Sequence, residues 1–434
     1  MKSLNECIPA SSRVFHLVVA WVLIVPLFYF ASLGKLWFQS EVTNNQLSAL
    51  YTGLMSSPMQ SEGRAVSISF FLITVMIASS KAKAIFALCK TNKTLPAMVL
   101  LAICSCAWSQ SPIASLVYSS YLAMNLIFVL YLYQRFSSQQ FLRLLEVVGW
   151  TCVCFNLCLA VFLPRYGIDH AAGTGAWRGM YSTKNVCSEV TTFLLAGTFF
   201  IERTSLLPKI ARAFYVALSV FLIIMTQSAT GKLMLLALIL CVCGSWLLQR
   251  LGRGDRTLLF VISVVAAVVF CVITSFYFSE LTYLLGKDPT LSNRTEIWRA
   301  VVASALKRPI LGYGYMGFFR GFQGENSGVS LATHSVIVHS HNGLLQIWID
   351  LGVLGVALVV YCFLQAFKDA SHCLLIRKSR YFRWCVCIVC LMAVYSFDEP
   401  PLMSANNLPW MLFMAACIGL SEGARRLRLG FDNE

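Results

Sequence analysis

The stretch Val338-His339-Ser340-His341-Asn342-Gly343 leads directly into the apolar segment 344–366, and this junction decides how the chain can fold. A helix of that length crosses the ~30 Å hydrocarbon core of a bilayer. Three of the six histidines of the chain, His334, His339 and His341, gather at its entry. Polar groups at a membrane surface lose hydration, so a cluster of them there indicates a function.

The composition is that of a polytopic membrane protein. Of 434 residues, 58% are apolar and only 12% are charged, whereas about a quarter of the residues of soluble domains are charged. The net charge of +15 comes from lysines and arginines in short clusters between apolar runs. That pattern indicates membrane orientation, and because no nucleic-acid-binding motif accompanies it we expect no nucleic acid partner.

The apolar runs predict an all-α bundle of about twelve transmembrane helices. Each run is about the length that a bilayer-crossing helix needs. The predicted spans are residues 14–34, 65–80, 95–111, 114–133, 143–163, 186–201, 211–228, 232–249, 257–278, 343–367, 383–398 and 403–421.

The basic residues predict that both termini are cytoplasmic. With that orientation, 22 of the 34 lysines and arginines fall in cytoplasmic segments, as the positive-inside rule requires. Residues 1–278 then hold nine helices, with outer loops 35–64 and 164–185. Residues 279–342 form a large extracytoplasmic loop, and residues 343–434 hold three helices and a basic cytoplasmic tail. Its aromatic, glycine and charged residues predict that loop 279–342 folds on the membrane surface.

Eleven basic residues remain on the outer side, and they concentrate in two places. Arg178 and Lys184 lie beside Trp, Ser, Thr and Asn185, just before a predicted span. Arg294 follows Ser and Asn and precedes Thr, Glu and Trp. A guanidinium fork binds phosphate oxygens in a bidentate manner, so both clusters favour an anionic phosphate ligand. The alternative is that these arginines reach up to lipid headgroups.

Two further polar motifs lie at outer helix ends. Residues 228–232, Ser-Ala-Thr-Gly-Lys, resemble the tail of a P-loop but lack its first glycine, and a capped helix break explains them better. Asp398 and Glu399 precede two prolines. This acidic pair could orient an arginine, hydrogen-bond a sugar or form a solvated turn.

Three roles are open to the histidines at the entry of segment 344–366. His334, His339 and His341 could bind zinc, but no H-E-x-x-H motif and no carboxylate at matching spacing accompany them. A single histidine, His341, could act as general base because its pKa is near neutrality. His339 and Asn342 would then support it, or the histidines could be structural. We expect a base and no metal.

At this point the chain resembles the superfamily of O-antigen ligases and Wzy-type polysaccharide polymerases, and within it the exopolysaccharide polymerases. The resemblance extends from about residue 95 to residue 420. The segments that carry it are Ser105-Cys106-Ala107-Trp108-Ser109 with Pro112, Arg178-Gly179 with Lys184-Asn185, Ser228-Ala229-Thr230-Gly231-Lys232, Asn293-Arg294-Thr295-Glu296-Ile297-Trp298, Pro309-Ile310-Leu311-Gly312-Tyr313-Gly314, and His339-Ser340-His341-Asn342-Gly343 with Asp350-Leu351-Gly352.

The resemblance implies an inverting, metal-independent glycosyltransferase of the bacterial inner membrane that uses no cofactor. Its donor would be a glycan on undecaprenyl pyrophosphate, polymerised at the extracytoplasmic face into exopolysaccharide or O-antigen. His341 would be catalytic, while Arg178, Arg294 and Lys184 would bind the donor pyrophosphate. His339, Asn342, Asn185, Tyr313 and Glu399 would support these residues or bind substrate. Membrane lipids, a chain-length regulator and a flippase are the implied partners.

Two alternatives stay open. An O-antigen ligase would use the same residues to transfer the glycan to lipid A–core. A transporter or flippase for lipid-linked glycan would carry internal repeats and charges in the middle of its spans. The chain shows no convincing repeat, and its predicted spans are nearly free of such charges.

Overall fold

The computed structural model is mostly helical over the residues that it describes, which are 69, 72–169, 175–250, 294–319, 324–333, 337–376 and 379–430. The sheet found there is a short antiparallel pair, β1 (Ile168–Asp169) and β2 (Ala176–Trp177), with Ile168 opposite Trp177. The helical part of the prediction is thus confirmed. Predicted spans 14–34 and 257–278, predicted loop 35–64 and His334 lie outside the described residues.

Five described helices are long and apolar enough to cross a membrane, or six if one bent pair is a single span. The five are α6 (Pro112–Arg135), α7 (Ser138–Phe162), α10 (Leu206–Met225), α11 (Ala229–Arg250) and α15 (Gly343–Ile376). They support a polytopic helical membrane protein, but they do not establish twelve spans.

Other predicted spans also form helices, but these helices are too short or too polar to count as membrane-crossing. With 15 and 16 residues, α9 (Lys184–Thr198) and α16 (Arg380–Tyr395) are short for a bilayer. In α17 (Leu408–Arg428) the last two turns carry Glu422 and three arginines. The predicted span 95–111 becomes α5 (Thr94–Cys104) and the short helix η1 (Ser105–Ala107).

The predicted span 65–80 is replaced by a bent pair of helices. Residues 72–79 form one helix and α4 (Ala82–Thr91) forms the next, at 94° to it. Lys81 lies in the bend and Lys83 in the first turn of α4, where a charged side chain is easier to hydrate than inside a span. This pair is either a broken span or a re-entrant segment.

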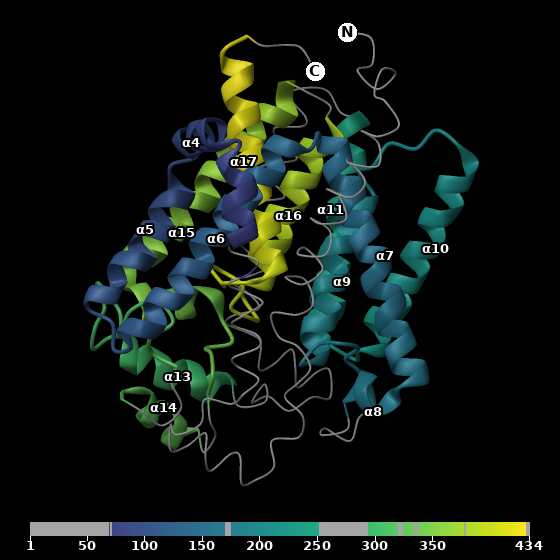
Figure 1. Ribbon diagram of the computed structural model, residues 1–434. Coiled ribbons are helices and arrows are strands. Elements are labelled where there is room, and N and C mark those ends of the chain that lie inside the picture. The colour runs from purple at the N-terminus through teal and green to yellow at the C-terminus, as the bar shows by residue number, and fades with distance from the viewer. Residues whose placement is uncertain are drawn as a thin grey trace. The chain divides into compact units, whose positions relative to one another are not determined.

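The described chain divides into two compact units. The first, Ser138–Gly231, holds α7, a single turn α8 (Pro164–Gly167), the β1–β2 pair, α9 and α10. Helix α9 packs against α7 and α10 (Figure 1) and is buried from Cys187 to Thr198. Its threonines satisfy their hydroxyl groups within the helix: Thr191 donates to the carbonyl of Cys187 at 2.7 Å and Thr192 to that of Ser188 at 2.8 Å.

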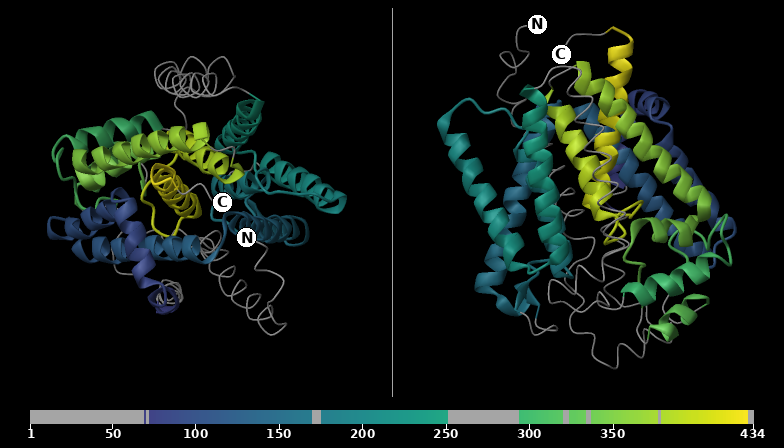
Figure 2. Two further views of the ribbon diagram at one scale, coloured as in Figure 1. Left: turned by 90° about the horizontal axis from the view of Figure 1, so that it is seen from above. Right: turned by 180° about the vertical axis from the view of Figure 1, so that it is seen from behind.

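The second unit covers the described residues of 72–137 and 232–430, and α17 is its central helix. Seen from above (Figure 2), yellow α17 lies between green α15 and the blue helices of the early chain. It packs against α16, α15, α6 and α4, and every residue from Leu408 to Ala424 is buried. A helix that is enclosed on all sides needs no apolar stripe. The hydropathy pattern therefore does not indicate which face of α17 packs against its neighbours.

Two helices from the predicted outer loop cover the amino end of α15. They are α13 (Arg294–Ala305) and α14 (Asn326–Ala332), and they share a core with α15. That core comprises Ile297, Val301, Ala305, Tyr313, Phe318, Val329, Ile337 and Ile349. The described part of segment 279–342 is therefore a packed layer; its place on the membrane surface stays a prediction.

Helix α15 is interrupted at Gly352, whose φ of 67° lies in the left-handed region. The backbone of 309–313 fills the break: Val353 donates to the carbonyl of Pro309 and Tyr313 to that of Ile349, both at 2.9 Å. A Cβ at position 352 would collide with the carbonyl of Ile310. Glycine is thus required there by both conformation and close approach.

Candidate active site

The histidine loop, residues 338–342, is fixed from three directions at the amino end of α15. Asn342 caps that helix, because its Oδ1 accepts the backbone N–H groups of Leu344 and Leu345 at 3.0 Å. The indole of Trp298 on α13 donates to the carbonyl of Ser340 at 3.0 Å, and the backbone of Gly343 donates to Ser396 at the end of α16 at 2.7 Å.

His341 takes a left-handed conformation inside this loop, with φ of 51°. Such a conformation costs on the order of 1–3 kcal/mol in a residue with a side chain, and the surrounding contacts must compensate for it. The imidazole is 29% exposed. Backbone strain at a partly accessible histidine is typical of a residue held for function.

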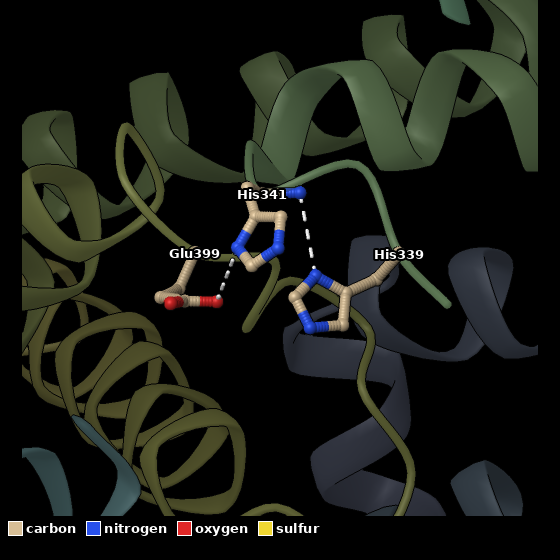
Figure 3. Close-up of side chains that lie close together, drawn as sticks. All are labelled: His339, His341 and Glu399. Carbon is tan, nitrogen blue, oxygen red and sulfur yellow. Dashed lines mark hydrogen bonds and ion pairs between the residues drawn. The ribbon is translucent and has the colours of Figure 1, made fainter. Parts of the chain in front are cut away.

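The imidazole of His341 faces Glu399, which lies just beyond α16 (Figure 3). The His341 Nδ1 is 3.5 Å from Glu399 Oε2. His339 is close on the other side: its Nδ1 accepts the backbone N–H of His341 at 3.3 Å, and the two ring centroids are 4.0 Å apart. Each of these three residues offers a ligand atom for a metal ion, and the three atoms lie within 4.8 Å of one another.

Arg294, the first residue of α13, connects the acidic pair to this site. Its Nη1 donates to the carbonyl of Asp398 at 3.0 Å and forms an ion pair with the Asp398 carboxylate. Its Nη2 is 3.4 Å from Glu399 Oε1. Of the three roles open to the acidic pair, the structure supports orientation of an arginine.

The pKa of Glu399 reflects two opposing effects. Burial raises this pKa, but His341, His339 and Arg294 together outweigh burial and bring it below its ordinary value. Burial also lowers the pKa of Arg294, against the effect of Glu399, yet an arginine stays protonated at neutral pH. Glu399 is therefore a carboxylate that faces two imidazoles with one oxygen and a guanidinium with the other.

The second predicted cluster, Arg178 with Lys184 and Asn185, lies in the first unit. Arg178 follows β2, and its Nε donates to the carbonyl of Tyr166 at 3.1 Å. Gly179 has a φ of 58°, and a Cβ there would collide with the side chain of Asn156. The turn after Arg178 is thus tight and specific to glycine.

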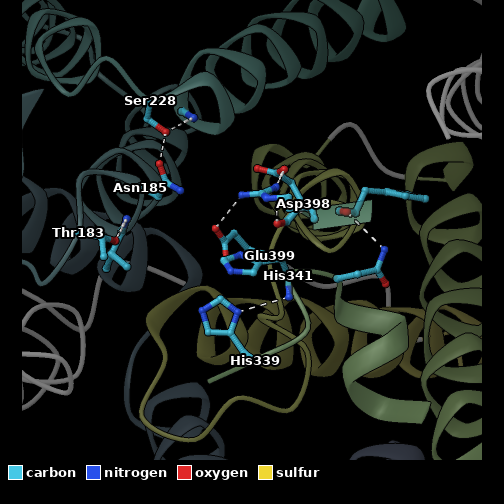
Figure 4. A network of polar contacts seen from close by, with 12 residues as sticks. Thr183, Asn185, Ser228, His339, His341, Asp398 and Glu399 are labelled. Carbon is cyan, nitrogen blue, oxygen red and sulfur yellow. Dashed lines mark hydrogen bonds and ion pairs between the residues drawn. The ribbon is translucent and has the colours of Figure 1, made fainter. Parts of the chain in front are cut away.

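Lys184 is the first residue of α9, and Asn185 follows it. The Oδ1 of Asn185 accepts the hydroxyl of Ser228 at 2.8 Å (Figure 4), and the Ser228 hydroxyl accepts the backbone N–H of Gly231 at 3.0 Å. This confirms a capped helix break at residues 228–232. A lysine at a helix amino end opposes the helix dipole, so an anion near Lys184 would remove an unfavourable interaction.

The structure places Tyr313 in the core. It is 1% exposed and donates its hydroxyl to the carbonyl of Ser304 at 2.9 Å. The segment 105–110 packs against Tyr313 and its neighbours in the sequence. The Trp108 indole donates to the carbonyl of Leu311, and the backbone N–H of Gln110 donates to the carbonyl of Tyr313, both at 2.9 Å. These two motifs of the resemblance thus pack against each other, and Tyr313 is positioned for structure more than for substrate.

Sequence reasoning assigned Glu399 only a supporting role and did not pair it with His341. The two residues are far apart in the chain, and they meet because α15 begins and α16 ends at this place. Trp298, which anchors the loop from α13, was quoted only as part of a motif. The proline pair after Glu399 was the available signal, since prolines exclude further helix and leave both carboxylates in the turn that follows α16.

Comparison with known proteins supports the resemblance seen in the sequence. Residues 214–360 match the family model described as O-antigen ligase. The exopolysaccharide production protein ExoQ of Rhizobium meliloti is 26% identical over 226 residues, which are 49% of this chain and 50% of ExoQ. The chain thus matches about half the length of this relative.

Shorter matches involve two rickettsial proteins, each named "putative polysaccharide ligase". The Rickettsia prowazekii protein is 32% identical over 91 residues, 20% of this chain and 22% of the relative. The Rickettsia typhi protein is 30% identical over the same length and the same shares. Residues 214–360 are therefore similar to the O-antigen ligase family, and these relatives are named for polysaccharide production and ligation. Arg294, His339 and His341 fall within the matched domain, whereas Arg178, Lys184 and Glu399 fall outside it.

Proposed function

We propose that this protein is an inverting membrane glycosyltransferase that polymerises undecaprenyl-pyrophosphate-linked oligosaccharide repeat units at the outer face of a bacterial inner membrane. The observation that carries the proposal is the strained, partly exposed His341 held beside the Glu399 carboxylate. The similarity of residues 214–360, which include His341, to the O-antigen ligase family supports the same chemistry. The donor, the carrier lipid and the membrane face are parts of the proposal.

His341 acts as general base on the hydroxyl of the acceptor sugar. Glu399 orients the imidazole through Nδ1, so that Nε2 takes the hydroxyl proton and the carboxylate stabilises the imidazolium that results. The acceptor oxygen forms its bond to the anomeric carbon as the bond to the pyrophosphate breaks. The electron pair leaves with the pyrophosphate, and a single displacement inverts the anomeric centre.

Arg178 and Lys184 bind the pyrophosphate of the donor. Two cations offset the negative charge that grows on this leaving group as the glycosidic bond breaks. Pyrophosphate leaves readily, so the reaction needs neither a general acid nor a metal. We expect turnover to continue in the presence of EDTA.

Arg294 positions Glu399 in this mechanism. The sequence predicted that Arg294 binds pyrophosphate, but its guanidinium faces two carboxylates. One positive and two negative charges leave a net negative group, which repels an added phosphate. If Arg294 binds the donor directly, its Ala variant will raise the donor KM. If it positions Glu399, the variant will lower kcat at an unchanged donor KM.

The proposal is tested with the purified full-length protein in liposomes and a synthetic lipid-pyrophosphate repeat unit. We expect a ladder of polymer on a gel, formed with or without EDTA. The ligase alternative is tested by adding lipid A–core, which a ligase glycosylates once and a polymerase ignores. Movement of lipid-linked glycan without any new glycosidic bond would contradict both and favour a flippase.

A further inference from the structure

We propose that His339, His341 and Glu399 form a binding site for a zinc-type divalent cation, and that the bound ion inhibits the enzyme reversibly. These three are the metal-ligating group that the described residues contain. The binding is independent of the proposed reaction. The inhibition rests on the proposed function, because it requires His341 to act as base.

The geometry is close to that of a zinc site. Tetrahedral zinc with bonds of about 2.0–2.1 Å to nitrogen and oxygen separates its ligand atoms by about 3.3 Å. The His341 Nδ1 and Glu399 Oε2 are already 3.5 Å apart, and all three ligand atoms lie within 4.8 Å. The His339 imidazole lies on the other side of His341 from Glu399 (Figure 3), so the His339 ring must move toward the other two ligands when an ion binds.

The state of His341 Nδ1 supports a ligand at this place. This nitrogen is buried, and its nearest polar partner is Glu399 Oε2 at 3.5 Å, which is the outer limit of a hydrogen bond. Buried polar atoms almost always have a hydrogen-bond partner, and a bound ion often accounts for one that has none. A cation between Nδ1 and Oε2 would give Nδ1 a close partner.

The charges around the site accept a cation. Arg294 contacts Oε1 of Glu399, which leaves Oε2 toward the histidines, and the Asp398 carboxylate lies against the same guanidinium. The described charged groups at the site are then one cation and two anions. Two imidazoles and one carboxylate suit zinc, copper or cobalt, whereas magnesium prefers oxygen ligands. Three protein ligands leave a fourth position open.

A bound ion prevents His341 from acting as a base, because it fixes the imidazole in the tautomer that carries its proton on Nε2. A neutral imidazole that coordinates a metal through Nδ1 carries its single proton on Nε2. In that form Nε2 donates and has no lone pair to accept the acceptor hydroxyl proton. Glu399 is engaged by the same ion and no longer stabilises an imidazolium. Binding of the cation and catalysis by His341 therefore exclude each other.

The binding test uses the purified full-length protein in detergent, stripped with chelator and titrated with Zn²⁺, with Co²⁺ absorption reporting the ligand set. The variants H339Q, H341Q and E399Q keep similar side-chain size, and each should weaken binding by about tenfold or more. H372Q is the matched control, because His372 is exposed on α15 outside the cluster. Thermal unfolding verifies that each variant is folded. If all three variants bind Zn²⁺ as tightly as the parent, or if Mg²⁺ competes equally, the site assignment is overturned.

The inhibition test adds Zn²⁺ to the liposome assay and then removes it with EDTA. We expect loss of turnover that EDTA reverses, and a half-inhibitory concentration that rises about tenfold in H339Q relative to that variant's own zinc-free rate. Zn²⁺ that binds but stimulates turnover would overturn the inhibition and the metal-independent mechanism, while the site itself would stand. Full activity of H341Q would overturn the proposed function alone, because the binding test is read without turnover.

Discussion

At the scale of single residues, the conformation of His341 depends most on the contacts around it. Its left-handed backbone is unfavourable, and a capping asparagine, an indole and a helix end hold it in place. Its imidazole sits between a second imidazole and a carboxylate whose pKa is lowered by its neighbours. This arrangement is suited to accept and stabilise one proton.

The first prediction concerns His341→Ala. Loss of a positioned base costs roughly 10²–10⁴-fold in rate, so we expect almost no polymer in the liposome assay at a normal protein level. His339→Ala should be milder, since His339 Nδ1 holds the backbone of His341 and leaves the imidazole that takes the proton in place. Near-normal polymer from His341→Ala together with an inactive His339→Ala would show that His339 is the base and His341 the supporting residue.

The second prediction separates positioning by Glu399 from a general effect on stability. Glu399→Gln keeps the shape and removes the charge, so kcat should fall, though by less than in His341→Ala. Residues that act as a unit are not additive. Glu399→Gln should therefore add little to the defect of His341→Ala in the double variant. Multiplied defects in the kinetics of the double variant would mean that the two residues act separately.

The third prediction concerns Arg178. Arg178→Ala should severely reduce turnover and raise the KM for the lipid-pyrophosphate donor, and Arg178→Lys should restore only part of both, because an ammonium cannot replace a bidentate fork. Arg165→Ala is the control, since Arg165 is an exposed arginine on α8 of the same unit. Equal effects of the two Ala variants would assign Arg178 to lipid headgroups instead.

At the scale of elements, hydropathy predicted the long simple helices and missed the interrupted ones. The predicted spans 114–133 and 143–163 coincide closely with α6 and α7, because apolar length alone defines such helices. The bend at Lys81 and the break at Gly352 depend on local charge and on the backbone of 309–313. The pairing of His341 with Glu399 needed the same tertiary information, whereas the histidine cluster itself was visible in the sequence.

The fourth prediction tests the break in α15. Gly352→Ala should lower the melting temperature for two reasons. A backbone with φ of 67° and ψ of −166° is open almost only to glycine and costs another residue about 1–3 kcal/mol, and the alanine Cβ would collide with Ile310. Gly328→Ala in α14 is the control, since a Cβ there meets nothing within 4 Å. Turnover should fall with stability, since the break joins α15 to the segment that packs against α13. An unchanged melting temperature for Gly352→Ala would show that the break is not required.

At the scale of the whole chain, the second unit separates a polar, basic helix end from the histidine loop. Ser421 on α17 accepts a hydrogen bond from Asn92 at 3.1 Å and donates to Asp369 on α15 at 3.0 Å. Asp369 also pairs with Arg428 at 3.2 Å. The basic carboxyl ends of α4 and α17 therefore meet the carboxyl half of α15, at the opposite end of α15 from the histidine loop. Under the polymerase proposal, the positive-inside rule places this end in the cytoplasm and the histidine loop outside.

The last prediction is the orientation that follows from this separation. Cysteines are introduced at Lys307, which is exposed beside the amino end of α15, and at Lys368, which is exposed toward its carboxyl end. In intact spheroplasts a membrane-impermeant maleimide should label position 307, and position 368 should react only after the membrane is opened. The parent protein gives the background from its native cysteines. Labelling of 307 only in opened membranes would place His341 on the cytoplasmic side, where an outward-facing lipid-linked donor cannot reach it, and the polymerase mechanism would fail.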